Sequence, residues 1–133
     1  MRPDLQAALV CEDVRFEASG ANTLVGVIQL VRAPQFPLRV MKLCVFCRWA
    51  SGQGQFKQLT RILKPDESQL AATETQFQLN DEDRLATNIA VFGGVEFTTP
   101  GQYPVEILLD NDLILRFYIP IVQVNTPTAP GQN

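Results

Sequence analysis

Three cysteines are the side chains of this sequence with the clearest potential for chemistry. Cys44 and Cys47 have the spacing of a Cys-x-x-Cys motif, which in redox enzymes sits at a helix N-terminus that lowers the thiol pKa. Here the pair lies inside an alternating stretch that predicts a strand, where an offset of three residues sends the side chains to opposite faces. A structural zinc site would need a second pair of ligands, and Cys11 is the only thiol left. We therefore interpret the three cysteines as small apolar side chains that pack.

Histidine is absent from the 133 residues. Its absence excludes hydrolases that use histidine as the general base, and it removes the commonest ligand of catalytic zinc. An enzyme built from this sequence would depend on carboxylates, lysine or cysteine alone. We predict that the chain is not an enzyme, and we assign no catalytic residue, metal ligand or cofactor.

Acidic residues gather in three short stretches that could serve a hard cation: Glu12-Asp13, Asp110 with Asp112, and Asn80-Asp81-Glu82-Asp83. Calcium binds roughly six to eight oxygen ligands, and the loops at one end of a β-sandwich can supply them. An ion- or small-ligand-binding module that uses these acidic loops is therefore an alternative function.

Glu12-Asp13 also has a simpler, local interpretation. Leu9 and Cys11 alternate in one phase, whereas Val14 and Phe16 alternate in the other. A bulge or tight bend at Glu12-Asp13 would shift the strand by one residue and reconcile the two phases. We favour this bend over an ion site.

The elements that must position these residues are strands. Tyr103, Val105, Ile107 and Leu109 alternate with polar neighbours, as in a half-buried strand, and residues 113–119 continue the pattern. Residues 110–112, Asp-Asn-Asp, predict a hairpin turn between the two strands. Pro120 lacks a backbone donor, which predicts an edge position or a bulge.

The longest predicted strand covers residues 38–50, and its two faces differ. One face is apolar and consists of Met41, Leu43, Val45, Cys47 and Trp49. The other mixes apolar and charged side chains and consists of Val40, Lys42, Cys44, Phe46 and Arg48. The phase of Trp49 predicts that it packs in the core.

About eight or nine short strands, separated by turn residues and without a long amphipathic helix, predict an all-β fold. We expect a two-sheet antiparallel sandwich, immunoglobulin-like or related, over residues 1–124. Residues 125–133 contain proline and glycine but no large apolar side chain, which predicts a flexible C-terminal tail. Smaller predictions are an edge strand at 70–79, one helical turn at 80–86 and a bulge or bend at Gly93-Gly94.

The composition is that of a globular domain, with 46% hydrophobic and 19% charged residues. The net charge of −3 and the scattered basic residues argue against nucleic-acid binding. No apolar run is as long as a membrane span, and the first one is too short and too soon followed by acids for a signal peptide. An odd number of cysteines in a chain that can bury a full core is typical of reduced thiols. We expect a cytoplasmic protein without a membrane or nucleic-acid partner.

Two long stretches, near the start and near the end, carry recognisable patterns. They contain Leu9-Val10-Cys11-Glu12-Asp13-Val14, Leu24-Val25-Gly26-Val27, Pro100-Gly101-Gln102-Tyr103-Pro104-Val105 and Pro120-Ile121-Val122-Gln123-Val124. The sequence resembles an uncharacterised family of small bacterial proteins with these motifs, which implies one β domain and no assigned activity. The Gly-x-Tyr segment is also similar to the strand of immunoglobulin-like sandwiches that carries a tyrosine corner. Val105 stands where antibody domains have a disulfide cysteine, so the likeness is architectural.

These observations predict a module that acts by binding a protein partner or by forming a homo-oligomer. A strand edge could accept a partner's strand, and a partly apolar sheet face could be covered by a partner. The residues that we predict to contact the partner are Val40, Cys44, Phe46 and Arg48.

Overall fold

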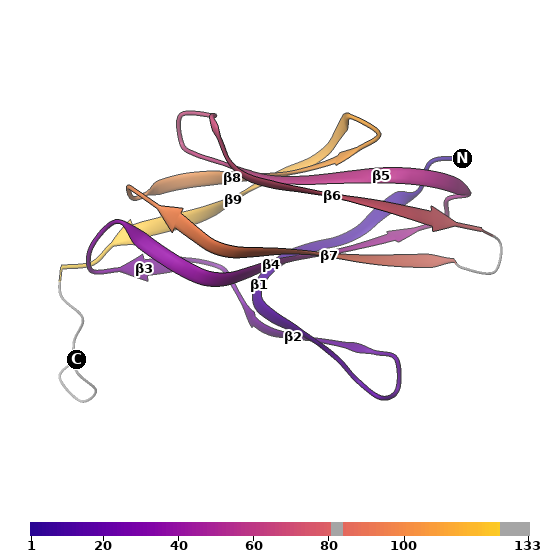
Figure 1. Ribbon diagram of the computed structural model, residues 1–133, viewed down its shortest axis with the longest axis horizontal. Helices are drawn as coiled ribbons and strands as arrows, with labels where there is room; N and C mark the ends of the chain where they lie inside the picture. The colour runs from indigo at the N-terminus through magenta and orange to yellow at the C-terminus, as the bar shows by residue number, and fades with distance from the viewer. Residues whose placement is uncertain (81–83, 126–133) are drawn as a thin grey trace.

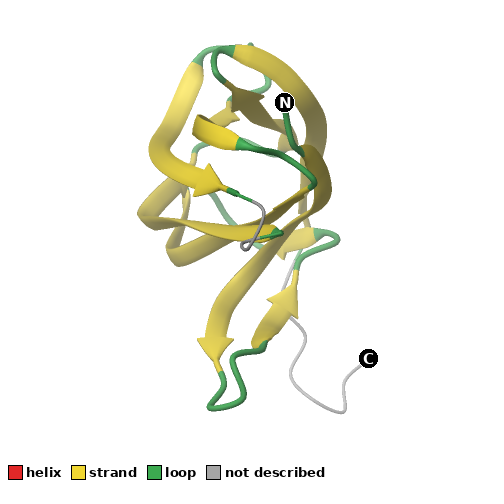
Figure 2. Cartoon of the chain, turned by 90° about the vertical axis from the view of Figure 1, so that its right-hand side faces the viewer, coloured by secondary structure: helices red, strands yellow, loops and turns green. Residues whose placement is uncertain are grey.

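The computed structural model describes residues 1–80 and 84–125, and all the regular elements in them are β-strands (Figures 1 and 2). The nine strands are β1 (Asp4–Phe16), β2 (Asn22–Val27), β3 (Val31–Ala33), β4 (Leu38–Ala50), β5 (Gly54–Leu63), β6 (Gln69–Leu79), β7 (Leu85–Phe97), β8 (Gly101–Leu109) and β9 (Asp112–Gln123). The predicted all-β class is confirmed.

The strands form two layers, a four-stranded sheet in the order β2-β1-β4-β7 and a five-stranded sheet in the order β3-β9-β8-β5-β6 (Figure 1). The predicted two-sheet sandwich is therefore confirmed. One ladder departs from the antiparallel prediction, because the short strand β3 pairs in parallel with residues 121–123 of β9.

The core lies between the sheets and takes alternate residues from their strands. β4 contributes Leu43, Val45, Cys47 and Trp49, and β8 contributes Tyr103, Val105, Ile107 and Leu109. Both faces agree with the alternation predicted from the sequence, except at Met41, which is exposed. Trp49 is fully buried, as its phase predicted.

A chain of buried polar side chains links the two sheets inside this core. The Trp49 indole Nε1 and the Asn88 amide Nδ2 both donate to Gln58 Oε1, at 2.7 and 2.8 Å. Gln58 Nε2 in turn donates to Thr60 Oγ1 at 2.7 Å. Because β5 supplies Gln58 while β4 and β7 supply its donors, these bonds fix the sheets against each other without leaving the amide unpaired.

Tyr103 forms the predicted tyrosine corner. Its hydroxyl donates to the backbone carbonyl of Thr99 at 2.6 Å, and the ring packs edge-on against Phe97 with 4.8 Å between centroids. The corner ties the start of β8 to the chain that leaves β7.

The two ends of β9 also match their sequence signals. Asp110 and Asn111 have φ values of 47° and 74°, which is the conformation of a two-residue hairpin turn between β8 and β9. Pro120 lies just before the residues of β9 that pair with β3, so only β8 pairs with it.

The one-residue slip predicted at Glu12-Asp13 is wrong, although β1 does bend where it leaves β4 after Cys11 and continues as the hairpin with β2 (Figure 1). β1 runs through both residues in one unbroken register with β2, from Cys11 opposite Val27 to Phe16 opposite Asn22. The register shift in β1 lies instead between Leu5 and Ala7. Leu9 and Cys11 face outward while Val10 enters the core, so the two apolar phases reflect two apolar faces and not a slip.

β4 and β7 pair in one antiparallel register, but their side chains change direction between residues 40 and 43 of β4 and between residues 92 and 95 of β7. Val40 and Leu43 are three residues apart and would face opposite sides of a regular strand, yet both pack against the core. Met41, which lies between them, is 72% exposed. The change lies opposite Gly93 and Gly94, the latter with a φ of 66° that only glycine adopts freely. The predicted bend at Gly93-Gly94 is thus present, but within one continuous strand.

Other predictions fall partly on residues 81–83 and 126–133, which lie outside the described residues. Leu85 and Ala86, assigned to a helical turn, belong to β7. β6 (Gln69–Leu79) is the last strand of its sheet, as predicted for 70–79. Within the described part of the chain, no helix has the length and hydropathy needed to cross a membrane.

Candidate interaction surface

The side of the four-stranded sheet that faces away from the core carries a continuous apolar surface, which we call the apolar outer face. Because strand side chains alternate, the residues between the core residues of β1, β4 and β7 all point to this side. The register sets them in two rows, Val27-Cys11-Cys44-Val91 and Leu9-Phe46-Ile89. In the described residues no further strand layer lies over these rows.

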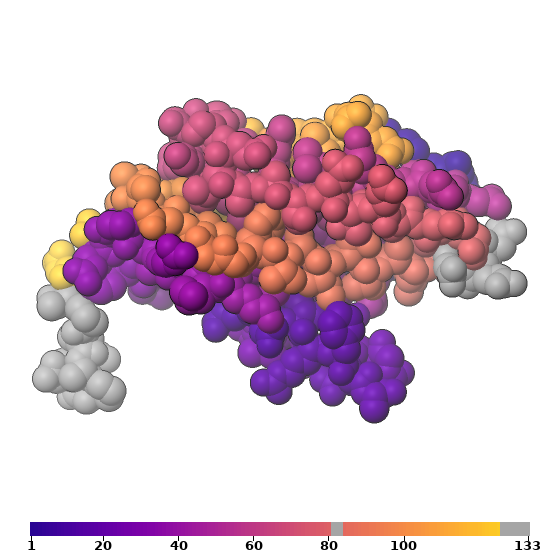
Figure 3. Space-filling model, viewed as in Figure 1, coloured from indigo at the N-terminus to yellow at the C-terminus, as the bar shows by residue number. Residues whose placement is uncertain are grey.

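Exposure varies strongly across the apolar outer face. Val91 at its margin is 55% exposed, whereas Phe46 at its centre is only 6% exposed and both Cys11 and Cys44 are buried. Water therefore reaches the margin of this face and not its centre. The hairpin of β1 and β2 projects from the body on this side of the molecule (Figures 1 and 3).

Charged side chains border the apolar outer face at both ends. The Arg48 guanidinium lies 5.6 Å from the centroid of the Phe46 ring, and its Nε donates to Thr87 Oγ1 at 3.2 Å. At the other end Lys42 Nζ donates to Asp13 Oδ1 at 2.6 Å. This hydrogen bond lowers the pKa of Asp13 and raises the pKa of Lys42.

The predicted partner-binding residues do not all share this face. Cys44, Phe46 and Arg48 do, and the structure adds Leu9, Ile89 and Val91 from the neighbouring strands. The placement of Val40 on this face is wrong, because the change of direction between β4 and β7 turns its side chain toward the core.

The three thiols occupy two separate environments. Cys44 and Cys47 lie on opposite faces of β4, as predicted, and Cys47 belongs to the core. Burial raises the pKa of Cys47 to about 12, partly offset by a hydrogen bond with Gln58. Cys44 instead lies directly opposite Cys11 on the apolar outer face, a pairing that the sequence analysis missed.

The outer side of the five-stranded sheet is built differently, around a buried carboxylate. Glu106 is 3% exposed and accepts hydrogen bonds from Arg61 Nε at 2.6 Å and Arg116 Nη1 at 3.1 Å. Arg116 also pairs with Glu67 and stacks over the Tyr118 ring. We call this group the Glu106 cluster. The sequence places Glu106 on the outer side, but only the strand register shows its two arginine partners directly opposite.

The acidic residues considered for an ion site are not brought together. Asp112 accepts a hydrogen bond from Arg2 beside the start of β1, whereas Glu12 lies eight residues after Asp4 on the same strand. At the rise of an extended strand that separation is about 26 Å. The grouping of Glu12-Asp13 with Asp110 and Asp112 is therefore wrong, and the described residues contain no cluster of three or more potential metal ligands.

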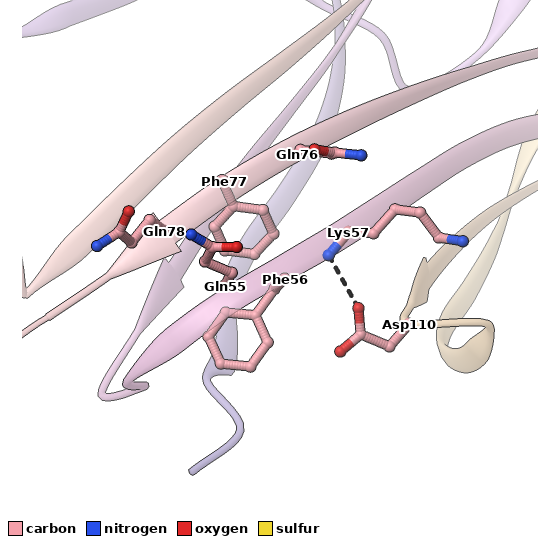
Figure 4. Close-up of a pocket in the computed structure, with 7 residues that line it drawn as sticks. All are labelled: Gln55, Phe56, Lys57, Gln76, Phe77, Gln78 and Asp110. Atoms are coloured by element: carbon pink, nitrogen blue, oxygen red, sulfur yellow. Dashed lines mark hydrogen bonds between the residues drawn. The ribbon is translucent and has the colours of Figure 1, made fainter.

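An open groove of about 510 Å³ lies over β5 and β6 (Figure 4). Its lining residues are Gln55, Phe56, Lys57, Gln76, Phe77, Gln78 and Asp110. The Asp110 carboxylate accepts a hydrogen bond from the Lys57 backbone N–H at 2.9 Å, the contact drawn in Figure 4. Asp110 thus holds the β8–β9 turn against β5, and three of the other lining side chains are neutral amides. The groove therefore does not gather groups suited to acid–base catalysis.

The fold and the surface define a class of small β-sandwich with a tyrosine corner and an apolar outer face on its four-stranded sheet. The chain belongs to DUF6941, a family of unknown function, whose model matches residues 6–122. The predicted resemblance to an uncharacterised family is thus confirmed. No curated protein matches the chain. Among solved structures, an immunoglobulin-like protein from Pseudomonas aeruginosa is similar, with 13% identity, a TM-score of 0.36 and coverage of 92% of this chain and 98% of that one.

Proposed function

We propose that this chain is a non-enzymatic, cytoplasmic interaction module whose apolar outer face binds a partner protein. The observation that supports this function is the pair of apolar rows on β1, β4 and β7, with no layer of described residues above them. The exposed members of these rows are Leu9, Val27 and Val91, and exposed apolar side chains that lie together are typical of a protein–protein contact.

The borders of the face suit a specific complex. Interfaces commonly combine an apolar centre with a polar rim, and arginine is enriched in them. Arg48 at one end and the Lys42–Asp13 pair at the other supply such a rim and would orient the partner along the strands.

Two strand edges offer a further means of binding. Asp112 to Pro120 of β9 pair only with β8, and Asp4 to Val10 of β1 pair mainly with β4. Backbone N–H and C=O groups on an unpaired edge can accept a strand from a partner.

The test compares two substitutions at exposed strand positions. Val91→Lys introduces a charge at the margin of the apolar outer face, and Gln76→Lys introduces the same charge on β6 in the other sheet. We expect each to change the free energy of unfolding by less than about 0.5 kcal/mol, because exposed substitutions are usually nearly neutral. Affinity capture from a lysate of the native source, read by mass spectrometry, should recover one companion with wild type and Gln76→Lys but not with Val91→Lys.

A companion that binds all three proteins equally would contradict the proposed role of this face. Light scattering of the purified proteins tests whether a second copy of the chain, and not another protein, covers this face. A dimer that Val91→Lys abolishes and Gln76→Lys preserves would make the partner a second copy of the chain.

A further inference from the structure

We propose that Cys11 and Cys44 are a redox modification site, at which two thiols form a reversible disulfide that joins β1 to β4. The inference rests on the strand register and on the positions of the two side chains. It does not depend on the proposed binding function.

The two cysteines are direct partners in the β1–β4 ladder. The Val10 carbonyl accepts a hydrogen bond from the Ile28 N–H, so the peptide groups of Val10 point toward β2. Peptide groups alternate in direction along a strand, so those of Cys11 point toward β4. Cys11 and Cys44 are therefore a hydrogen-bonded pair, for which the Cα separation is about 5.5 Å. Disulfides usually span Cα separations of about 4.4–6.8 Å, and this separation lies within that range. The Cβ atoms of a hydrogen-bonded pair lie about 5.5 Å apart, whereas a disulfide needs about 3.5–4.5 Å, so β1 and β4 must approach each other by about 1 Å. The resulting strain makes the bond easier to reduce, in keeping with a reversible disulfide.

Both side chains also point to the same side of the sheet. Cys11 and Cys44 lie on the apolar outer face, and the Cys44 thiol donates a weak hydrogen bond to the Glu12 carbonyl, with 4.0 Å between sulfur and oxygen. The thiol of Cys44 is therefore directed toward β1, beside Cys11.

Cys47 is excluded from this exchange by the sheet itself. It lies on the core side of β4, where Gln58 and Trp49 surround it, whereas Cys44 lies on the outer side. The backbone of β4 separates the two thiols, so the disulfide is expected between Cys11 and Cys44 alone.

The surroundings make the reaction slow at neutral pH. Burial raises the pKa of both Cys11 and Cys44, and the proximity of the two thiols raises that of Cys11 further. The charged groups beside them are Asp13 and Lys42, while the flanking strands β2 and β7 contribute Val27 and Val91. Because the thiolate is the reactive form, the rate should rise with pH.

Hydrogen peroxide is a small oxidant that suits two shielded thiols. One thiolate attacks a peroxide oxygen; the S–O bond forms, the O–O bond breaks, and hydroxide leaves. The sulfur of the second cysteine then attacks the resulting sulfenic acid; the S–S bond forms, the S–O bond breaks, and the oxygen leaves as water. In total two thiols and one peroxide give one disulfide and two waters, with two electrons passing from sulfur to oxygen.

The experiment treats the folded wild-type chain with hydrogen peroxide, blocks free thiols with N-ethylmaleimide in denaturant, and maps the peptides by mass spectrometry. We expect one crosslink between the peptides of Cys11 and Cys44, a loss of two hydrogen atoms, and one maleimide on Cys47. Dithiothreitol should restore three free thiols. The initial rate should rise about tenfold per pH unit below the thiol pKa.

Two variants serve as controls. Cys47→Ala should form the same crosslink, and Cys44→Ala should form none within the chain. Crosslinks between chains, separate oxidation of Cys11 and Cys44 to sulfinic acids, or a disulfide that forms only after unfolding would each overturn the proposal.

Discussion

The outer sides of the two sheets meet solvent in opposite ways. The four-stranded sheet presents the apolar outer face, where Phe46 and two cysteines lie without a covering layer of described residues. The five-stranded sheet presents the Glu106 cluster, in which each charge near the centre already has an opposite charge beside it.

The difference bears on which side of the sandwich a partner would cover at the lower free-energy cost. Covering the Glu106 cluster would remove solvent from arginines already engaged with carboxylates, and that desolvation is costly. Covering the apolar outer face would remove from water the exposed hydrocarbon of Leu9, Val27 and Val91 and a narrow charged rim, and burial of the hydrocarbon is favourable. The contrast supports a contact on the four-stranded sheet.

Loss of the buried carboxylate should have the largest effect on stability. Glu106→Gln keeps the shape of the side chain but leaves Arg61 and Arg116 without their shared charge. We expect unfolding free energy to fall by about 3 kcal/mol, the lower end of the range for a broken buried pair because both guanidinium groups still reach solvent. Urea denaturation measures the change.

A triple replacement provides the control for that experiment. Arg61→Met, Glu106→Leu and Arg116→Met together should recover much of the lost stability, since apolar side chains of similar volume can replace a buried ionic group. If Glu106→Gln changes stability no more than an exposed substitution does, the contrast between the two outer sides is wrong.

A charge at the centre of the apolar outer face should have a smaller effect on folding. Phe46→Lys removes a buried ring, but no described layer lies above it, so the lysine ammonium can reach water along its stem. We expect a loss of about 1–2 kcal/mol from the lost burial, together with loss of the partner. Phe46→Leu should keep both the stability and the binding of the partner. Unfolding of Phe46→Lys under native conditions would show that the ring belongs to the core.

The smallest effect concerns the exposed ion pair at the border of this face. Because the folded protein lowers the pKa of Asp13, the pair contributes stability above the ordinary carboxyl pKa and loses it as the pH falls through the folded value. Lys42→Met should therefore reduce stability slightly at neutral pH and not at the acidic end. Unfolding curves of both proteins across the acid range would show this convergence, and a constant difference would contradict it.

Local sequence patterns predicted the features that depend only on near neighbours in the chain, such as side-chain alternation and tight turns. Tyr103 and its alternating successors, the turn at Asp110-Asn111 and the burial of Trp49 all follow from neighbours in the sequence. Val40 and Met41 were misplaced because β4 changes direction opposite Gly94, and residues of β4 itself carry no sign of it.

The candidate sites depended on register, which local patterns do not contain. Cys11 faces Cys44, and Glu106 faces Arg61 and Arg116, only because distant strands align residue by residue. A pairing error of one residue would move each of these side chains to the other side of its sheet. The sequence therefore supports the outer position of Cys44, Phe46 and Glu106 but not their partners.

The direction of the first and last strands has a mechanical consequence. Asp4 opens β1 at one end of the sandwich, and β9 reaches Gln123 at the opposite end (Figure 1). A pull that separates these two residues acts along the strands, so β1 slides against β4 and β9 against β8. The inter-strand hydrogen bonds lie across that direction and are loaded together, not one after another. The domain should therefore resist stretching between its ends as a stiff element, yielding only when a whole ladder shears.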